Sequence, residues 1–231
     1  ELINKRRSVR KFKDTKVPES VMRKCLKASV LAANSSNLQP WEFYWVRDPK
    51  KKETVVKACF SQNAAKGAKE LVIAVSKIDT WKRNRDLIIE EHKKKNRFIP
   101  LVDKYYNKLI PFAYYHDFLG ISGLIKRFIF LFVNIYGYFK PVIRGPIYKH
   151  ELFETVSKTT ALACQNFMMA LVAEGFDSCP MEGFDEKRIK KMLKLNWQSH
   201  VVMIFGIGEA ASNGVYSERF RVDDSLVIKE I

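Results

Sequence analysis

Long apolar runs are scarce in this chain of 231 residues. The most apolar stretch, residues 118–139, is interrupted by Lys126 and Arg127, and its longest uncharged part has 12 residues. A membrane-spanning helix needs about 20. Residues 1–13 are charged and lack the apolar segment of a signal peptide. We therefore expect no membrane span and a cytoplasmic location, and, because the chain begins at Glu1, we expect a few native residues to precede it.

Cysteine is also sparse, and the cysteines that are present form no CxxC pair. No His lies at metal-ligand spacing from them. This usage excludes a disulfide-framed mini-protein and gives no reason to expect a metal site. Reduced thiols agree with a cytoplasmic location. The four positions are Cys25, Cys59, Cys164 and Cys179.

Acidic residues are outnumbered, since 25 Asp and Glu stand against 41 Lys and Arg and give a formal charge of +16. A hydrophobic content of 47% excludes a disordered chain, and the length suits a single domain. The charge favours an anionic partner, whether nucleic acid, anionic lipid or a phosphorylated cofactor. Because the sequence has no helix-turn-helix, zinc-finger or RNP-like motif, we do not expect nucleic acid to be the partner.

Helical and strand patterns alternate along the chain. Residues 152–174 are apolar almost all round, which predicts a buried central helix with Gly175 as its C′ residue. Asp185 is placed to be the N-cap of an amphipathic helix. The mixture predicts an α+β or α/β domain. The expected helices are residues 18–33, 50–67, 152–174 and 185–194, with charged helical pieces in 82–98, and the expected strands are residues 43–46, 71–75 and 201–207.

Four short patches concentrate polar or basic groups. Residues 6–10 (RRSVR) place three guanidiniums and a hydroxyl where they can grip a phosphate, and residues 34–41 (NSSNLQPW) form an amide-rich loop suited to a polar heterocycle. Residues 175–185 (GFDSCPMEGFD) connect two helices by a tight path whose N–H groups can face a ligand. Arg219 and Arg221 alternate in an extended segment and can meet one anion. Taken alone, the two basic patches are better explained as an ordinary basic N-terminus and tail, and residues 175–185 can be an ordinary helix connection. The density of amides in residues 34–41 argues for more than an ordinary loop.

Together and in this order, the patches resemble the nitroreductase family of FMN-dependent NAD(P)H oxidoreductases. The resemblance reaches from residue 6 to residue 221 and is closest to nitrobenzoate-reductase-like members. It implies an α+β fold in which helices flank a central mixed, mainly antiparallel sheet, with a long central helix and an intertwined homodimer. Residues 1–231 would form a single domain.

The resemblance also assigns binding residues. One subunit would hold the phosphate and ring edge of FMN with its basic termini, and the amide-rich loop would come from the other subunit. The backbone N–H of Glu182 or Gly183 would reach flavin N5, and no side chain is assigned as a catalytic base. The expected cofactor-binding residues are Arg6, Arg7, Ser8, Arg10, Asn34, Ser35, Ser36, Asn37, Gln39, Asn63, Lys66, Pro180, Met181, Glu182, Gly183, Arg219 and Arg221.

The implied reaction is ping-pong. NAD(P)H delivers a hydride to flavin N5 and leaves, and a nitroaromatic, quinone or similar acceptor then takes two electrons. Reductive dehalogenation, enone reduction and flavin binding without turnover are alternatives on the same fold, and a basic nucleic-acid or membrane-surface protein is the alternative outside the family. Cys179 would lie near the flavin, where we expect a small packing residue rather than a redox thiol.

The middle region, residues 78–150, is longer than the compact core of the family. We expect this enlarged region to cover the active-site cleft, and the alternatives are an arm at the dimer interface or a basic amphipathic surface that touches a membrane. Membrane contact is not expected, because it would need Lys126, Arg127, Lys140 and Arg144 to flank an exposed apolar face.

Overall fold

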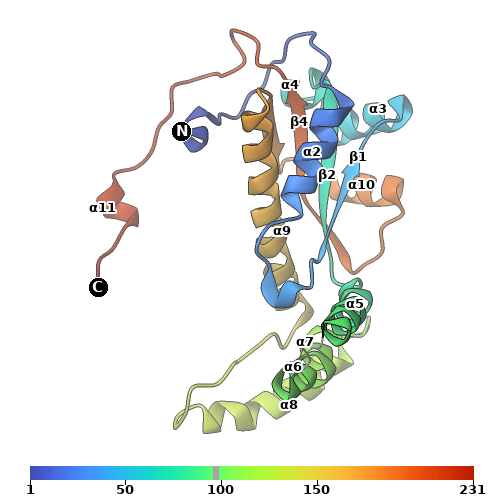
Figure 1. Ribbon diagram of the computed structural model, residues 1–231, viewed down its shortest axis with the longest axis vertical. Helices are drawn as coiled ribbons and strands as arrows, with labels where there is room; N and C mark the ends of the chain where they lie inside the picture. Colours follow the sequence, from blue (N-terminus) through green and yellow to red (C-terminus); the bar gives the residue numbers. More distant parts are fainter. Residues whose placement is uncertain (96–98) are drawn as a thin grey trace.

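The computed structural model describes residues 1–95 and 99–231. Its centre is a four-stranded sheet in the order β1-β2-β4-β3, and every neighbouring pair is antiparallel. Helices cover both faces of the sheet (Figure 1), which confirms the α+β class. The strands are β1 (Trp41–Trp45), β2 (Glu70–Lys77), β3 (Asp177–Met181) and β4 (Ser199–Gly208), and the α-helices are α1 (Leu2–Lys5), α2 (Glu19–Ser29), α3 (Pro49–Ala58), α4 (Asn63–Lys66), α5 (Trp81–Lys94), α6 (Pro100–Lys104), α7 (Ile110–Tyr114), α8 (Ile121–Tyr136), α9 (Lys149–Ala173), α10 (Glu186–Leu193) and α11 (Asp224–Val227).

The two faces of the sheet separate two apolar cores. Successive side chains of a strand point to opposite faces, so β2 places Leu71, Ile73 and Val75 in the core beneath α3, α4 and α10. Val72 and Ala74 of the same strand lie in the core beneath α2 and α9. The continuous apolar run of β2 therefore reflects a strand that is buried on both faces.

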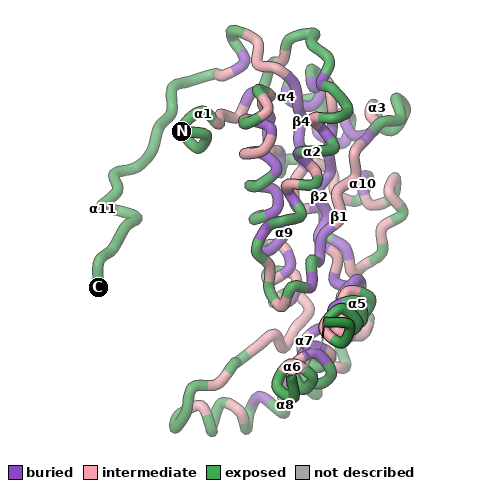
Figure 2. Tube along the Cα trace, viewed as in Figure 1, coloured by how far each residue is buried: buried purple, intermediate pink, exposed green. Residues whose placement is uncertain are grey.

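Helix α9 has one covered side and one open side (Figure 2). On the covered side, the Phe167 ring packs between Phe43 and Phe205, with centroid distances of 6.3 and 5.4 Å. On the open side, Leu162 is 52% exposed. The expectation of a helix buried all round is therefore wrong for the single chain, because the described elements leave the side of α9 that carries Leu162 uncovered. Gly175 follows the helix with a φ of +80°, which confirms it as the C′ residue.

Two expected elements differ from the structure. The helix expected over 50–67 is interrupted between α3 and α4, because Phe60 and Ser61 adopt left-handed φ values of 54° and 52°. Residues 177–181 form strand β3 instead of only joining two helices. Pro180 has no N–H to donate, and the edge position of β3 tolerates that loss.

The remaining expected elements are present with shifted ends. The side chain of Asp185 accepts a hydrogen bond from the backbone N–H of Arg188 at 3.1 Å, which confirms the N-cap of α10. The expected strands over 43–46, 71–75 and 201–207 correspond to β1, β2 and β4. After Tyr216 the chain leaves the body as an exposed arm that contains α11 (Figure 1).

The middle region divides into a packed part and a projecting part. Helices α5 to α7 contact the N-terminal half of α9 and the loop before β1 through a separate apolar cluster that includes Leu38, Tyr106, Ile110 and Leu152. Helix α8 projects beyond them, away from the sheet (Figure 1). The last residues of the helical stretch expected over 82–98 lie outside the described residues. Among residues 1–95 and 99–231, no helix combines the length and hydropathy that a membrane crossing needs.

Candidate functional site

The two basic patches meet in one cavity of about 290 Å³. The N-terminal segment is fixed there by the sheet: Val9 N–H donates to the Ser178 carbonyl of β3 at 3.1 Å, and Arg10 N–H donates to the Gly214 carbonyl at 2.7 Å. These bonds hold residues 6–10 beside the incoming C-terminal arm, where Arg7 Nη2 donates to the Ser217 carbonyl. The lining includes six of the expected residues, namely Arg6, Arg7, Ser8, Arg10, Arg219 and Arg221.

Like charges crowd this cavity. Burial lowers the pKa of the Arg6 guanidinium, and the nearby Arg219, Arg221 and Arg7 lower it further. Part of this set is already held by the backbone, since Arg219 Nη2 donates to the carbonyls of Asn4 at 2.9 Å and Arg6. Because the guanidiniums repel one another, a bound anion with several oxygens stabilises the arrangement.

A second group of expected residues lies beside this cavity. Asn63 Nδ2 donates to the Tyr216 hydroxyl at 2.9 Å, and the Arg10 guanidinium lies 5.1 Å from the centre of the Tyr216 ring. Gln62 Nε2 donates to the Gly183 carbonyl at 3.0 Å. The first turn of α4 thus connects the basic cavity to residues 182–183. The sequence analysis did not identify Gln62 or Tyr216, although Tyr216 precedes the Arg219 motif by only three residues.

The residues at the end of β3 have different environments. Met181 is buried in the apolar core and Pro180 is half-buried, whereas Glu182 and Gly183 are exposed. A Cβ placed on Gly183 would find open space around it. The backbone at Glu182 and Gly183 is therefore free to face a ligand, whereas the Met181 side chain contributes to packing. Lys66 is exposed, at the end of the helical turn that Asn63 begins.

The amide-rich loop lies at the other end of the sheet. Ser36, Asn37 and Gln39 have φ values of 57°, 51° and 46°, a backbone conformation that non-glycine residues rarely adopt. Asn34 Oδ1 holds the loop by accepting from Gln39 N–H at 2.9 Å. Three left-handed residues in so short a segment indicate a loop whose shape is maintained for a purpose other than packing.

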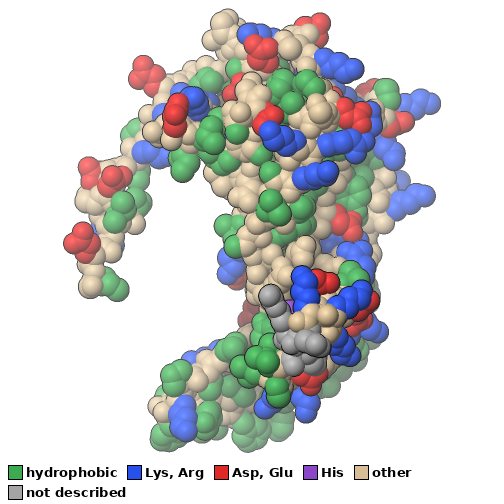
Figure 3. All heavy atoms as spheres, viewed as in Figure 1, with side chains coloured by type: hydrophobic (Ala, Val, Ile, Leu, Met, Phe, Trp, Pro, Cys, Tyr) green, Lys and Arg blue, Asp and Glu red, His purple; other side chains and the backbone are tan. Residues whose placement is uncertain are grey.

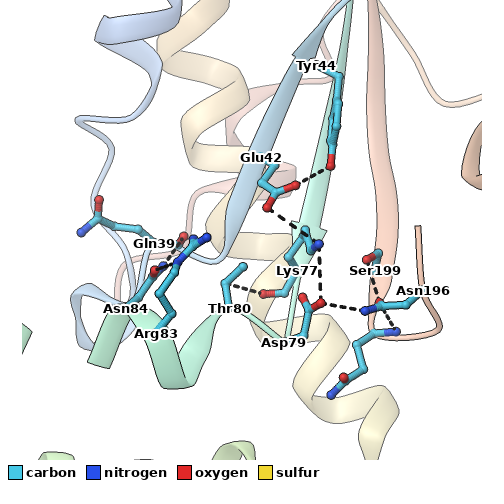
Figure 4. A network of polar contacts seen from close by, with 11 residues as sticks. Gln39, Glu42, Tyr44, Lys77, Asp79, Thr80, Arg83, Asn84, Asn196 and Ser199 are labelled. Carbon is cyan, nitrogen blue, oxygen red and sulfur yellow. Dashed lines mark hydrogen bonds and ion pairs between the residues drawn. The ribbon is translucent and has the colours of Figure 1, made fainter. Parts of the chain in front are cut away.

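The middle region fixes this loop from outside. Asn84 Nδ2 donates to the Leu38 carbonyl at 2.7 Å and to the Gln39 carbonyl at 3.3 Å, as Figure 4 shows for the Gln39 contact. The Tyr106 hydroxyl donates to the Ser36 carbonyl at 3.0 Å. Asn37 and Gln39 line a cavity of about 530 Å³ together with Trp41 and residues of α5. The sequence analysis did not identify Asn84 or Tyr106 as supports of the loop.

The expected binding residues therefore form two groups in one chain. The basic cavity lies near the Glu70 end of β2, where β4 and β3 meet the N-terminal segment. The amide-rich loop lies near the Lys77 end, where Lys77 N–H donates to the Pro40 carbonyl. At about 3.3 Å per residue, the length of β2 separates these ends by roughly 23 Å. One chain alone does not bring the two groups together.

Comparisons with known proteins find relatives and solved structures that cover nearly the whole chain. A curated relative, the NADH dehydrogenase of Thermus thermophilus, is 24% identical over 219 residues, covering 95% of this chain and 90% of the relative. Among solved structures, a Staphylococcus epidermidis protein described as an NAD(P)H:FMN oxidoreductase superposes with a TM-score of 0.75 at 18% identity, covering 100% of this chain and 94% of that one. A protein from Exiguobacterium sibiricum, described as a nitroreductase in complex with FMN, superposes with a TM-score of 0.70 at 20% identity, covering 100% and 96%.

The family comparison extends over nearly the whole chain. The model of the nitroreductase family matches residues 3–209, a range that contains the N-terminal basic patch, the amide-rich loop, α4 and strand β3. The matched segment thus includes both groups of candidate binding residues except for the arginines of the C-terminal arm. The solved structures share the sheet and helices of this fold. Because the family model matches nearly the whole chain, the chain belongs to the nitroreductase family of oxidoreductase enzymes.

Proposed function

We propose that this protein binds FMN and uses NAD(P)H to reduce nitroaromatic, quinone or similar acceptors in the cytoplasm. The observation that carries the proposal is the convergence of five arginines on one cavity beside the exposed backbone of Glu182 and Gly183. The family and the FMN complex of a structural neighbour support the choice of cofactor.

The donor set fits the phosphate of FMN. Planar guanidiniums form paired, charge-assisted hydrogen bonds with phosphate oxygens, and such bonds are about twice as strong as neutral ones. Burial and then the nearby arginines lower the pKa of Arg6, and a bound dianion offsets the repulsion among these arginines. In this proposal, Arg6, Arg7, Ser8 and Arg10 hold the phosphate end, with Arg221 and the backbone-anchored Arg219 completing the cavity.

The proposed site needs a second copy of the chain. The basic cavity and the loop over Asn34–Gln39 lie at opposite ends of β2, too far apart in one chain to enclose one small cofactor. A homodimer supplies the loop of one copy to the cavity of the other. The exposed side of α9 and the C-terminal arm that leaves the body are surfaces available for that association (Figures 1 and 2).

The chemistry that FMN supplies when bound is the acceptance and return of a hydride at N5. The chain provides binding and orientation. The backbone N–H of Glu182 or Gly183 is free to donate toward the ring, while Asn63 and Lys66 lie on α4 at the ring-edge side of the cavity. The nicotinamide donor and the acceptor then use one cleft in succession, which is the ping-pong order.

A visible spectrum of the purified protein tests the proposal first. After incubation with excess FMN and desalting, we expect flavin absorption at about one FMN per chain, followed by NAD(P)H oxidation when a nitroaromatic or quinone is added. A colourless protein contradicts the proposal. Bound FMN without oxidation of NAD(P)H by any acceptor, including enones and halogenated aromatics, would identify a flavin-binding protein without turnover.

Replacing Cys179 separates a redox thiol from a packing residue. Burial raises the pKa of the Cys179 thiol, although Arg10 and Arg6 oppose this effect, so the nucleophilic thiolate is disfavoured. We expect Cys179→Ala to keep steady-state turnover within about twofold of the unsubstituted protein. A loss of turnover with FMN still bound would show instead that the thiol takes part in the reaction.

A further inference from the structure

Helix α8 has an apolar outer face that the fold does not use. Nine large apolar side chains of this 16-residue helix are each between 40% and 65% exposed. At 100° per residue they fall within one arc of about 160°. They are Ile121, Leu124, Ile125, Phe128, Ile129, Leu131, Phe132, Ile135 and Tyr136.

The opposite face of α8 fixes the helix to the protein. Gly123, Lys126 and Phe130 are buried. Lys126 Nζ donates to the carbonyls of Ala113 at 3.1 Å and Tyr115 at 2.9 Å, and Phe130 stacks on Phe112 with 6.3 Å between ring centroids. The orientation of α8 is therefore set by its inner face, and this leaves the apolar outer face directed away from the protein.

The apolar surface continues past the end of α8. Tyr138 and Phe139 are 87% and 82% exposed, and Ile143 is also exposed. Figure 3 shows hydrophobic side chains gathered over this projecting end of the molecule, with basic groups among them. Soluble monomers rarely expose so large an apolar patch unless something covers it.

The charges on α8 and on residues 138–150 have one sign. Residues 118–150 contain no Asp or Glu, and they contain five Lys and Arg. Arg127 borders the apolar arc, and Lys140 and Arg144 follow the helix; all three are exposed. Lys126, which the sequence analysis had placed with them, is buried and not part of this rim. Basic residues beside an apolar helix face, with aromatic residues at its end, are typical of helices that lie in the surface of an anionic membrane.

Two other occupants fit the observations less well. A second copy seated here by the same face would bring its own Arg127, Lys140 and Arg144 toward these three, and residues 118–150 contain no Asp or Glu to pair with them. The sequence predicted that this region covers the cleft, which would need the apolar face of α8 to turn toward the protein. In the structure, α5 to α7 make the apolar contacts with α9 and the loop before β1, and α8 projects beyond them (Figure 1). An anionic lipid surface satisfies both the apolar arc and the basic rim.

We propose that α8 and residues 138–143 dock the protein on the surface of an anionic lipid bilayer, with the helix lying in the plane of the interface. At 1.5 Å per residue the helix is about 24 Å long, and in this orientation it does not cross the bilayer. The nine exposed apolar side chains of α8 enter the acyl boundary, while Arg127, Lys140 and Arg144 reach the headgroups.

Vesicle flotation of the full chain tests this docking without any cofactor. We expect the protein to float with vesicles of phosphatidylcholine containing about 30% phosphatidylglycerol, and to float much less with phosphatidylcholine alone. Phe128→Glu is expected to lower binding roughly tenfold or more, because a charge replaces an inserted ring. The Phe128 ring packs only on the neighbouring Phe132 among the aromatic contacts described, so folding should be unaffected.

Matched variants keep the test specific. Phe60→Glu makes the same substitution at a side chain that is 71% exposed but distant from α8, and it should bind as the unsubstituted protein does. Arg127→Gln with Lys140→Gln should remove most of the preference for anionic vesicles, whereas Lys50→Gln with Lys51→Gln, on α3, should not. The proposal is overturned if Phe128→Glu and Phe60→Glu bind anionic vesicles equally well. It is also overturned if the unsubstituted protein floats with neither kind of vesicle. A third outcome that overturns the proposal is a protein that does not bind vesicles and whose oligomer mass falls on Phe128→Glu, because α8 would then be an interface between copies.

Discussion

Replacing Arg6 by Gln is expected to weaken FMN binding by about 10- to 100-fold. A hydrogen bond to a charged group contributes about 1.5–3 kcal/mol, and each 1.4 kcal/mol is a factor of ten in affinity. Arg6 lines the basic cavity, and its pKa is lowered by burial and by Arg219, Arg221 and Arg7. Its guanidinium therefore lies where a phosphate gains most from a paired contact. Titration of the flavin fluorescence with protein measures the change.

Lys5→Gln is the matched control for Arg6→Gln. It removes the same charge from the adjacent residue, but Lys5 pairs with Glu1 and is not part of the cavity lining. An exposed pair of this kind contributes little, so the FMN dissociation constant should stay within about threefold. If the two variants lose affinity equally, the arginines act only through the overall field of the protein and do not contact the phosphate.

The sequence predicted what is local in this site. Residues 6–10 and 34–39 carry their chemistry in consecutive side chains, so the order of residues along the chain is enough to indicate the basic patch and the amide-rich loop. The contact between Asn63 and Tyr216 joins positions 153 apart, and no spacing pattern indicates it. For the same reason the sequence analysis did not identify Gln62, whose bond to Gly183 spans 121 positions.

The errors in the fold have related causes. Strand β3 contains Asp177 and Pro180, which are poor strand formers, and its pairing with β4 outweighs those local preferences. The break between α3 and α4 depends on left-handed φ values at Phe60 and Ser61. Neither residue type is one from which a left-handed backbone is predicted. In both places the local residue preferences do not indicate the conformation that the folded chain adopts.

Gly206→Ala is expected to destabilise the fold strongly and to disturb the site with it. A Cβ at Gly206 would lie 2.0 Å from the Ala64 carbonyl oxygen and 3.0 Å from its carbon. The obstacle is backbone, which cannot move aside as a side chain does, so α4 or β4 must shift. Overpacking of this severity costs about 3 kcal/mol, or roughly 6–12 °C in Tm for a domain of this size. Thermal unfolding followed by circular dichroism measures the change.

The same variant connects packing to cofactor affinity. Helix α4 carries Asn63, and Gln62 immediately precedes it, so displacement of α4 should break the bonds to Tyr216 and Gly183. The fraction of Gly206→Ala that remains folded should therefore bind FMN more weakly. Gly183→Ala is the control for stability alone, because a Cβ there meets open space and should change Tm by less than about 2 °C. A Gly206→Ala protein as stable as this control would show that α4 does not rest against β4 as closely as the structure has it.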